Sequence, residues 1–258
     1  MRSGKKKSLM SGRKCLVVII LLILAWGPSA AAEEPEETPR WKGDLSLGLS
    51  LARGNSRSSS FSFTVSADGP VNESKTLLWA NKLVYLFGEV GGETSAESLL
   101  AVTRLDWQHG GRFFTYFELQ GMRDRFKNLD SRVLPAAGAG YKVIARKTVT
   151  LVVDAGLSRV FTKYHDPNST ENYTSLKAGE QFVWKISETS EFNERMDLVP
   201  DISDFARYFV RWEANLITAL AKSWSVKLTL IDSYDHKPVG LGIKKNDVVF
   251  IAALSRKF

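Results

Sequence analysis

The stretch WKGDLSLGLSLAR, residues 41–53, alternates apolar and polar side chains along most of its length. One set consists of Leu45, Leu47, Leu49 and Leu51, and the other includes Lys42, Asp44, Ser46 and Ser50. Because successive side chains of a strand point to opposite faces, this stretch predicts a strand with one apolar and one polar face. Similar runs recur to the C-terminus without a helical pattern between them. Long two-faced strands with no helices to cover them predict a closed sheet.

The first 32 residues have the composition of a targeting segment. A basic start is followed by the apolar core Leu16 to Trp26 and by the small residues Ser29 to Ala32. This order is typical of a secretory signal peptide, and the core is shorter than the roughly 20 apolar residues that span a bilayer. We therefore predict a cleaved signal peptide over residues 1–32, with an uncleaved membrane anchor as the alternative. Residues 33–40 are acidic and hold two prolines, which predicts a flexible lead-in.

Removing the signal peptide changes what the net charge implies. Six of the 35 Lys and Arg residues lie in it, so the mature chain has 29 basic residues against 28 acidic ones. A nearly neutral chain offers no basic patch for nucleic acid. The only cysteine, Cys15, precedes the apolar core, whereas the acylated cysteine of a lipoprotein would follow it. The mature chain is therefore expected to have no disulfide framework, thiolate site or lipid-bearing cysteine.

Twelve strands are predicted after residue 40, many with about the length that crosses an outer membrane at a tilt, roughly nine to eleven residues. In chain order they span residues 41–53, 59–67, 76–87, 97–108, 113–123, 132–143, 148–163, 173–186, 189–199, 207–220, 224–234 and 247–258. The connections after odd-numbered strands are predicted to be longer than most of the others, as in a barrel with both termini in the periplasm. Residues 41–258 are thus predicted to form an all-β domain, an antiparallel up-and-down transmembrane β-barrel of about twelve strands.

The two strand faces predict what surrounds the barrel, with the leucines of residues 41–53 against lipid and the polar set facing the lumen. Charges of both signs in the middle of long strands favour a barrel over the alternative, a soluble periplasmic β-sandwich that binds a ligand. The candidate lumen-lining residues are Arg104, Asp106, Glu118, Lys177, Glu191, Arg195, Asp197, Arg207, Arg211, Glu213 and Lys227. If these charges pair they plug the interior, and if they are separated they line a narrow polar channel.

Three residues do not fit the simple pattern. Pro135 lies near the start of a predicted strand, where it indicates a bulge or another irregularity. Glu180 and Glu194 fall on the predicted lipid face, which indicates a bulge or a shift of register in those strands.

The sequence contains no motif of a familiar catalytic or metal site. Its three histidines, His109, His165 and His236, lie in or beside predicted connections and do not have metal-ligand spacing. A phosphate-binding loop, a dinucleotide fingerprint and a serine nucleophile elbow are all missing from the sequence. We therefore predict no catalytic residue, metal or cofactor. The alternative, a barrel-type lipid-modifying enzyme, would need a serine beside one of the histidines.

Several short segments carry a resemblance to a known family. They are the opening strand with Gly54-Asn55-Ser56, the segment Gly138 to Tyr141, Asp201 to Asp204, and Lys245-Asn246-Asp247. With these segments, residues 41–258 resemble the family of salt-induced outer-membrane proteins, a domain of unknown function numbered 481. The resemblance implies an outer-membrane barrel connected with salt or osmotic response, and it brings no catalytic residues.

The C-terminus resembles the signal that the outer-membrane assembly machinery reads. Phe258 ends the chain, and Phe250, Ala252 and Leu254 precede it at alternate positions, although Arg256 stands where an aromatic residue is usual. The expected partners are this machinery and the lipids and lipopolysaccharide of a Gram-negative outer membrane. The protein itself is expected to be a monomer. The protein is predicted to be a structural envelope protein or a narrow channel, and it is not predicted to be an enzyme.

Overall fold

The structure is a computed structural model that describes residues 40–258 except residues 56–57, 91–92 and 167. The predicted signal peptide, residues 1–32, and all but the last residue of the predicted lead-in lie outside the described residues. The described chain forms twelve strands and one short 3-10 helix. In this part of the chain, no helix is long and apolar enough to cross a membrane.

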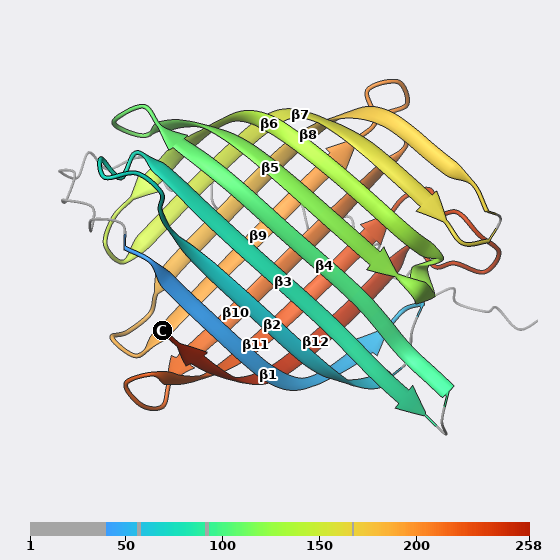
Figure 1. The fold of residues 1–258 in the computed structure, drawn as a ribbon, viewed down its shortest axis with the longest axis horizontal. Coiled ribbons are helices and arrows are strands. Elements are labelled where there is room, and N and C mark those ends of the chain that lie inside the picture. Colours follow the sequence, from blue (N-terminus) through green and yellow to red (C-terminus); the bar gives the residue numbers. More distant parts are fainter. Residues whose placement is uncertain (1–39, 56–57, 91–92, 167) are drawn as a thin grey trace, which may run out of the picture. The chain divides into compact units, whose positions relative to one another are not determined.

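The twelve strands follow chain order around one closed antiparallel sheet (Figure 1). Their bounds are β1 Lys42–Arg53, β2 Ser58–Pro70, β3 Leu77–Val90, β4 Glu93–Gln108, β5 Phe113–Asp124, β6 Leu129–Ala145, β7 Val149–Tyr164, β8 Thr170–Lys185, β9 Ser190–Pro200, β10 Tyr208–Ala219, β11 Trp224–Asp235 and β12 Asn246–Lys257. The 3-10 helix η1, Arg125–Lys127, lies between β5 and β6. The predicted twelve-stranded up-and-down barrel is confirmed, and the alternative of a two-sheet sandwich is wrong.

The first and last strands close the barrel, and Figure 1 shows the blue β1 beside the dark red β12. Leu47 lies opposite Leu254 and Leu51 opposite Phe250 in a regular antiparallel register. β1 begins and β12 ends at the same rim of the barrel, which we call the terminal end. We call the opposite rim the far end. Because β1 and β12 each pair on both sides, the sheet has no open edge.

The predicted strands are all present, but the predicted loop lengths need correction. The long connection expected over residues 88–96 is wrong, because β3 and β4 continue to pair past a bulge between Gly88 and Glu89. At the far end only the connections 201–207 and 236–245 are longer than the turn 71–76 at the terminal end. The position of the chain ends therefore distinguishes the two rims better than loop length does.

The apolar faces of the strands point outward. Leu49 is 71% exposed, whereas the next residue, Ser50, is 1% exposed. The same alternation continues on β12, where Phe250 and Leu254 are exposed and Ile251 is buried. An outer face of exposed apolar side chains is what a barrel surrounded by lipid requires.

The interior is partly apolar. One cluster of buried side chains lies on the inner face of β5, β6, β7 and β9 and includes Phe114, Leu134 and Val160. A second cluster, on β11 and β12, includes Ile231 and Ile251. Burying a side chain of this size contributes roughly 1.5–3 kcal/mol, so these clusters stabilise the barrel wall from inside. The remaining inner surface carries the charged residues described below.

Of the irregularities predicted from sequence, the one at Pro135 is present and the bulge at Glu180 and Glu194 is not. At Pro135 the ladder with β7 is interrupted, because proline has no N–H to donate, but the register is the same on both sides of the gap. The pairing of β8 with β9 has no register shift, so the bulge expected there is wrong. Glu180 and Glu194 lie on the outer face, where Nε1 of Trp212 donates to the Glu194 carboxylate at 3.2 Å.

Candidate functional site in the lumen

Glu118 on β5 lies at the centre of the charged interior, and its side chain is buried. Its carboxylate forms ion pairs with Arg104 at 3.1 Å, Lys177 at 3.2 Å and Arg195 at 3.2 Å. These three cations come from β4, β8 and β9, so the carboxylate on β5 joins its own strand to strands up to four positions away in the barrel. A buried charge without partners is costly, and this arrangement gives Glu118 three partners.

Three further carboxylates complete a cluster that we call the buried network. The network consists of Arg104, Asp106, Glu118, Asp154, Lys177, Arg195 and Asp197. Asp154 lies 3.2 Å from Arg104 and 3.7 Å from Lys177. Asp197 lies 3.0 Å from Lys177 and 3.0 Å from Arg195. Each of these two carboxylates is therefore held between two cations.

An aromatic ring and a glycine shape the space that the network occupies. The Arg104 guanidinium lies 4.0 Å from the centre of the Tyr116 ring, while its Nε donates to Asp106 at 2.8 Å. A Cβ atom at Gly179 would lie 2.7 Å from the carboxylate of Asp154. A larger residue at Gly179 would therefore displace Asp154 from its cations.

A second group of charges crosses the lumen from β3 to β10, and we call Lys82, Arg211 and Glu213 the crossing group. Lys82 forms an ion pair with Glu213, whose carboxylate also lies 3.5 Å from Arg211. Asn215 donates to Glu213 at 3.2 Å. Because β3 and β10 are five positions apart by the shorter way around the barrel, this contact spans the lumen.

The predicted lumen residues divide among these groups and the two rims. Arg104, Asp106, Glu118, Lys177, Arg195 and Asp197 belong to the buried network, and Arg211 and Glu213 to the crossing group. Lys227 lies 3.5 Å from Asp44, and Glu191 lines a cavity that reaches the terminal end. Arg207 precedes β10 in a far-end connection, where it pairs with Glu171 at 3.4 Å.

Four cavities lie along the lumen. One of about 930 Å³ reaches the terminal end at Arg40 and Lys42, and one of about 650 Å³ reaches it beside Lys257. We call these two the terminal cavities. Two much smaller ones, of about 60 and 70 Å³, lie beneath the far-end connections. Arg211 is the one described residue that lines all four, so it stands where the wide and the narrow parts of the lumen meet.

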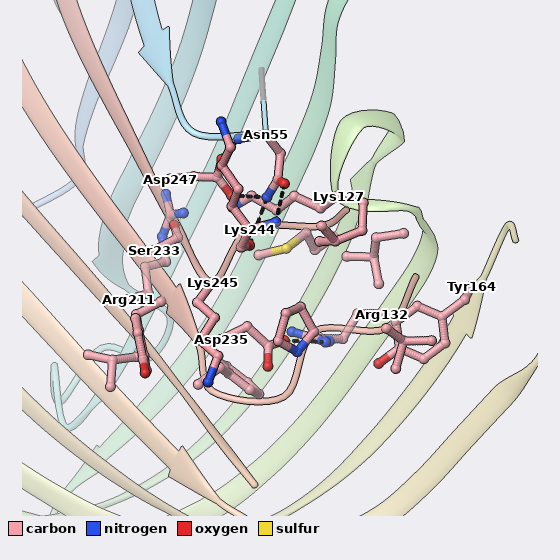
Figure 2. Close-up of a pocket in the computed structure, with 18 of the residues that line it drawn as sticks. Asn55, Lys127, Arg132, Tyr164, Arg211, Ser233, Asp235, Lys244, Lys245 and Asp247 are labelled. Carbon is pink, nitrogen blue, oxygen red and sulfur yellow. Dashed lines mark hydrogen bonds and ion pairs between the residues drawn. The ribbon is translucent and has the colours of Figure 1, made fainter. Parts of the chain in front are cut away.

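Residues 236–245, which we call the far-end loop, line one of the two small cavities and are held by Asn55 (Figure 2). The Asn55 side chain donates to the Lys244 carbonyl at 3.0 Å and accepts from the Lys244 N–H at 2.6 Å. Asp247 accepts from the Asn55 N–H at 2.5 Å and pairs with Lys127 at 3.4 Å. The β1–β2 connection and η1 are thereby joined to the base of the far-end loop.

Two further contacts hold the sides of the far-end loop. Asn128 donates to the Val239 carbonyl at 3.2 Å. Lys237 donates to Asp204 at 2.5 Å, which joins the loop to the connection 201–207. This hydrogen bond lowers the pKa of the exposed Asp204 carboxyl below its ordinary value. The two longest far-end connections thus support each other.

Residues 45–258 match the family described as "Protein of unknown function, DUF481". The chain belongs to this family. No curated protein sequence matches the DUF481 chain.

Two solved structures of outer-membrane barrels share the fold of the DUF481 chain. The NanC porin has a TM-score of 0.56 and 8% sequence identity, with 83% of this chain and 100% of that chain covered. The COG4313 outer membrane channel from Pseudomonas putida F1 has a TM-score of 0.52 and 9% identity, with 90% and 100% covered. At such low identity the likeness concerns the fold alone.

Two charged residues of the DUF481 site, Lys82 and Asp154, are missing from the residues predicted from sequence. Asp154 shares its face of β7 with Ser158 and Thr162, so alternation alone could have placed it inside the barrel. Lys82 is different, because neighbours on its face such as Val84 are apolar. Polarity cannot distinguish the two faces of β3, and the partner of Lys82 lies 131 residues away in the chain.

The surroundings of the histidines and carboxylates bear on metal and serine-hydrolase chemistry in the described part of the DUF481 chain. Among these residues, no group of three or more His, Cys, Asp or Glu side chains could hold a metal ion. The three histidine rings contact Thr115, Asp130 and Tyr234, and no serine is among these partners. A serine hydrolase needs a histidine in hydrogen-bond reach of its nucleophile. Most of the predicted lumen charges are paired, which is the arrangement expected to plug the interior, but cavities of about 930 and 650 Å³ lie beside the pairs, so the pairs do not fill the lumen. What this arrangement can do is hold, repel or pass charged solutes.

Proposed function

We propose that this DUF481 protein is an outer-membrane barrel that forms a narrow channel for small polar solutes. The observation that carries the proposal is the row of four cavities along the lumen, all of them lined by Arg211. The terminal cavities have room for a small solute, whereas the far-end cavities have room for only a few water molecules. The junction at Arg211 would therefore limit the size of what passes.

The outer face supports a location in a membrane. Its apolar side chains are exposed along the strands, and aromatic side chains gather near the terminal end. The ring centres of Trp41 and Trp79 lie 6.5 Å apart, and the Arg256 guanidinium lies 5.7 Å from the centre of the Trp224 ring. Aromatic and basic side chains of this kind are common where a barrel wall leaves the hydrocarbon layer. In this setting the outer face meets outer-membrane lipids and lipopolysaccharide.

The two rims imply an orientation. Bacterial outer-membrane barrels keep both chain ends in the periplasm, which would direct the terminal cavities inward to the periplasm. The far-end loop would then face the outside of the cell. A wide lumen on the periplasmic side and a narrow outer end, lined in part by a hydrogen-bonded loop, are the arrangement of a channel with a restricted outer opening.

Single-channel recording tests this proposal directly. Purified protein, refolded in detergent and inserted into a planar bilayer, is expected to give small and uniform current steps. Arg211→Ala is expected to increase their size, because it shortens the side chain that lines all four cavities. Glu213 would keep Lys82 as its partner in this variant.

The matched control is Arg159→Ala, since Arg159 is an exposed arginine on β7 that donates to Thr174 at 2.8 Å. Its removal is expected to leave the current steps unchanged. Electrical silence of both the wild type and Arg211→Ala, in protein whose folding is verified by a heat-dependent shift on a gel, would contradict the channel and favour a plugged structural barrel.

A role in salt or osmotic response is the physiological part of the proposal. A narrow envelope channel would let small solutes redistribute when the external salt concentration changes. A strain without the protein is expected to recover more slowly after a rise in NaCl, and the wild-type chain should restore recovery. Equal recovery with and without the protein would remove the osmotic role and leave the channel itself untouched.

A further inference from the structure

We propose that the larger terminal cavity binds small organic anions that carry an apolar part, such as short aliphatic carboxylates. The proposal rests on the channel function and names the class of solute that the channel admits. Three features of the cavity carry it: the way cations and carboxylates are exposed, the basic residues at its opening, and an apolar strip on one wall.

Two of the cations, Lys82 and Arg195, are more exposed in the cavity than the carboxylates they pair with, whereas Arg104 is less exposed than Asp106. The side chains of Lys82 and Arg195 are 30% and 32% exposed, whereas those of Glu118 and Glu213 are 3% and 11% exposed. All four side chains line this cavity. A solute would therefore meet positive groups first, with their carboxylate partners behind them.

One carboxylate of the buried network is more exposed to the cavity than the others, and an adjacent arginine balances its charge. Asp106 is partly exposed, and it accepts from Arg104 Nε at 2.8 Å. In this position it lowers the positive potential on the β4 side of the cavity. The strongest attraction for an anion is therefore expected between Lys82 and Arg195.

The opening of the cavity carries further basic residues. Arg40 and Lys42 are exposed at the rim, and Lys257 lies at the opening of the neighbouring cavity. Asp68 also lines the opening, close enough to Lys42 to interact with it electrostatically. Lys257 lines only the neighbouring cavity, so two basic groups, Arg40 and Lys42, stand against this one carboxylate at the opening of the larger cavity. The excess of positive charge there would draw anions toward the cavity. Glu191, deeper in the neighbouring cavity, lines that cavity alone.

One wall of the cavity is apolar. Leu78 and Ala80 on β3, with Leu100 and Val102 on β4, line the same space as Lys82. A water-filled channel is usually lined by polar residues, so an apolar strip beside cations favours a solute with both characters. The volume, about 930 Å³, lies in the range of sites that hold small organic molecules.

The test compares probes of opposite charge and of increasing length. In a KCl gradient the reversal potential is expected to show preference for chloride over potassium. Hexanoate in the terminal-side solution is expected to reduce the current, and hexylammonium at the same concentration is not. In the series acetate, butyrate and hexanoate, affinity should rise with chain length, because each buried CH₂ strengthens binding by up to about fourfold.

Lys82→Gln is expected to weaken hexanoate binding by about tenfold, since it removes a charged contact. Lys163→Gln is the matched control, because Lys163 is an exposed lysine on β7, outside the cavity lining. Folding of both variants is verified by the heat-dependent gel shift, and hexanoate binding is also measured by calorimetry on refolded protein.

These measurements separate the two proposals. Current steps with cation preference, or equal inhibition by hexanoate and hexylammonium, would overturn the anion site and keep the channel. Absence of current with hexanoate binding that Lys82→Gln weakens would overturn the channel and support the anion site. Hexanoate binding that is undetectable by calorimetry would overturn the anion site whatever the current.

Discussion

Lys177 shows at the scale of one residue how burial determines what an ion pair contributes. Its amine is buried and lies 3.2 Å from Glu118, 3.7 Å from Asp154 and 3.0 Å from Asp197. Lys177→Met keeps most of the side-chain volume and leaves four carboxylates of the network with two arginines. Because an unpaired buried charge is costly, we expect the free energy of unfolding to fall by about 3–5 kcal/mol. Urea unfolding of the refolded protein in micelles measures it.

The control makes the same substitution in an exposed pair. Lys237 donates to Asp204 at 2.5 Å, but both side chains are exposed, so Lys237→Met is expected to cost at most about 1 kcal/mol. Adding Asp154→Asn to Lys177→Met should recover part of the loss, since it removes one carboxylate left without its amine. Equal losses for Lys177→Met and Lys237→Met would show that the buried network does not depend on this lysine.

The same residues show how far sequence reasoning extends at this scale. Alternation along β5 is enough to expect Glu118 inside a barrel. Its partners cannot be found in that way, because they lie 14, 59 and 77 residues from it in the chain and come from three other strands. Alternation is a local property of one strand, whereas the distance between two inner faces depends on strand number and register. Inner faces were therefore predictable, and the ion pairs between them were not.

At the scale of one element, the far-end loop depends on Asn55. The Asn55 side chain makes three hydrogen bonds, two with the backbone of Lys244 and one with the Asp247 carboxylate. Asn55→Ala removes all three and keeps the N–H that donates to Asp247. We expect trypsin to cleave after Lys244 or Lys245 roughly tenfold faster or more, because each lost bond lowers the cost of opening the loop. Larger or more frequent current steps should accompany the cleavage.

Asn72 provides a matched control at the opposite rim. Its side chain accepts from the Leu77 N–H at 2.9 Å and donates to Ser74 at 2.7 Å, and so holds the turn 71–76. Asn72→Ala is expected to loosen that turn without changing cleavage of the far-end loop. If both variants accelerate cleavage after Lys244 equally, the effect comes from general destabilisation, and the Asn55 contacts do not hold the loop.

Element boundaries were predictable where the signals are local. Turn residues and a period of two are properties of a few neighbouring positions, and all twelve strands were placed by them. The β3–β4 connection was predicted wrongly because Gly88 and Glu89 resemble a turn in isolation, while pairing with β4 carries the strand through them as a bulge. Neighbouring strands can therefore override a turn signal.

At the scale of the whole molecule, the barrel depends on the junction of its two ends. Gly43 and Phe258 exchange backbone hydrogen bonds of 2.9 and 3.0 Å, and a Cβ atom on Gly43 would lie 2.1 Å from the Phe258 ring. The ring thus lies against the glycine and covers the last pair of the closing ladder. This contact gives the terminal phenylalanine a structural role in addition to the expected role as an assembly signal.

Two variants separate these roles. Gly43→Leu displaces the Phe258 ring but keeps the terminal phenylalanine as an assembly signal, whereas Phe258→Ala removes both the packing and the signal. Without the assembly machinery, we expect each to destabilise the refolded barrel by about 1 kcal/mol, the value of the apolar area that the ring covers. In cells, Phe258→Ala should lower the amount of assembled protein further than Gly43→Leu. The control is Phe117→Ala, which removes an outward ring from β5, away from the closing strands and the C-terminal signal, and is expected to leave assembly in cells unchanged. Gel-shift assays on refolded protein and on isolated membranes measure both effects. Equal assembly of Gly43→Leu and Phe258→Ala in cells would mean that the phenylalanine acts through closure of the barrel alone.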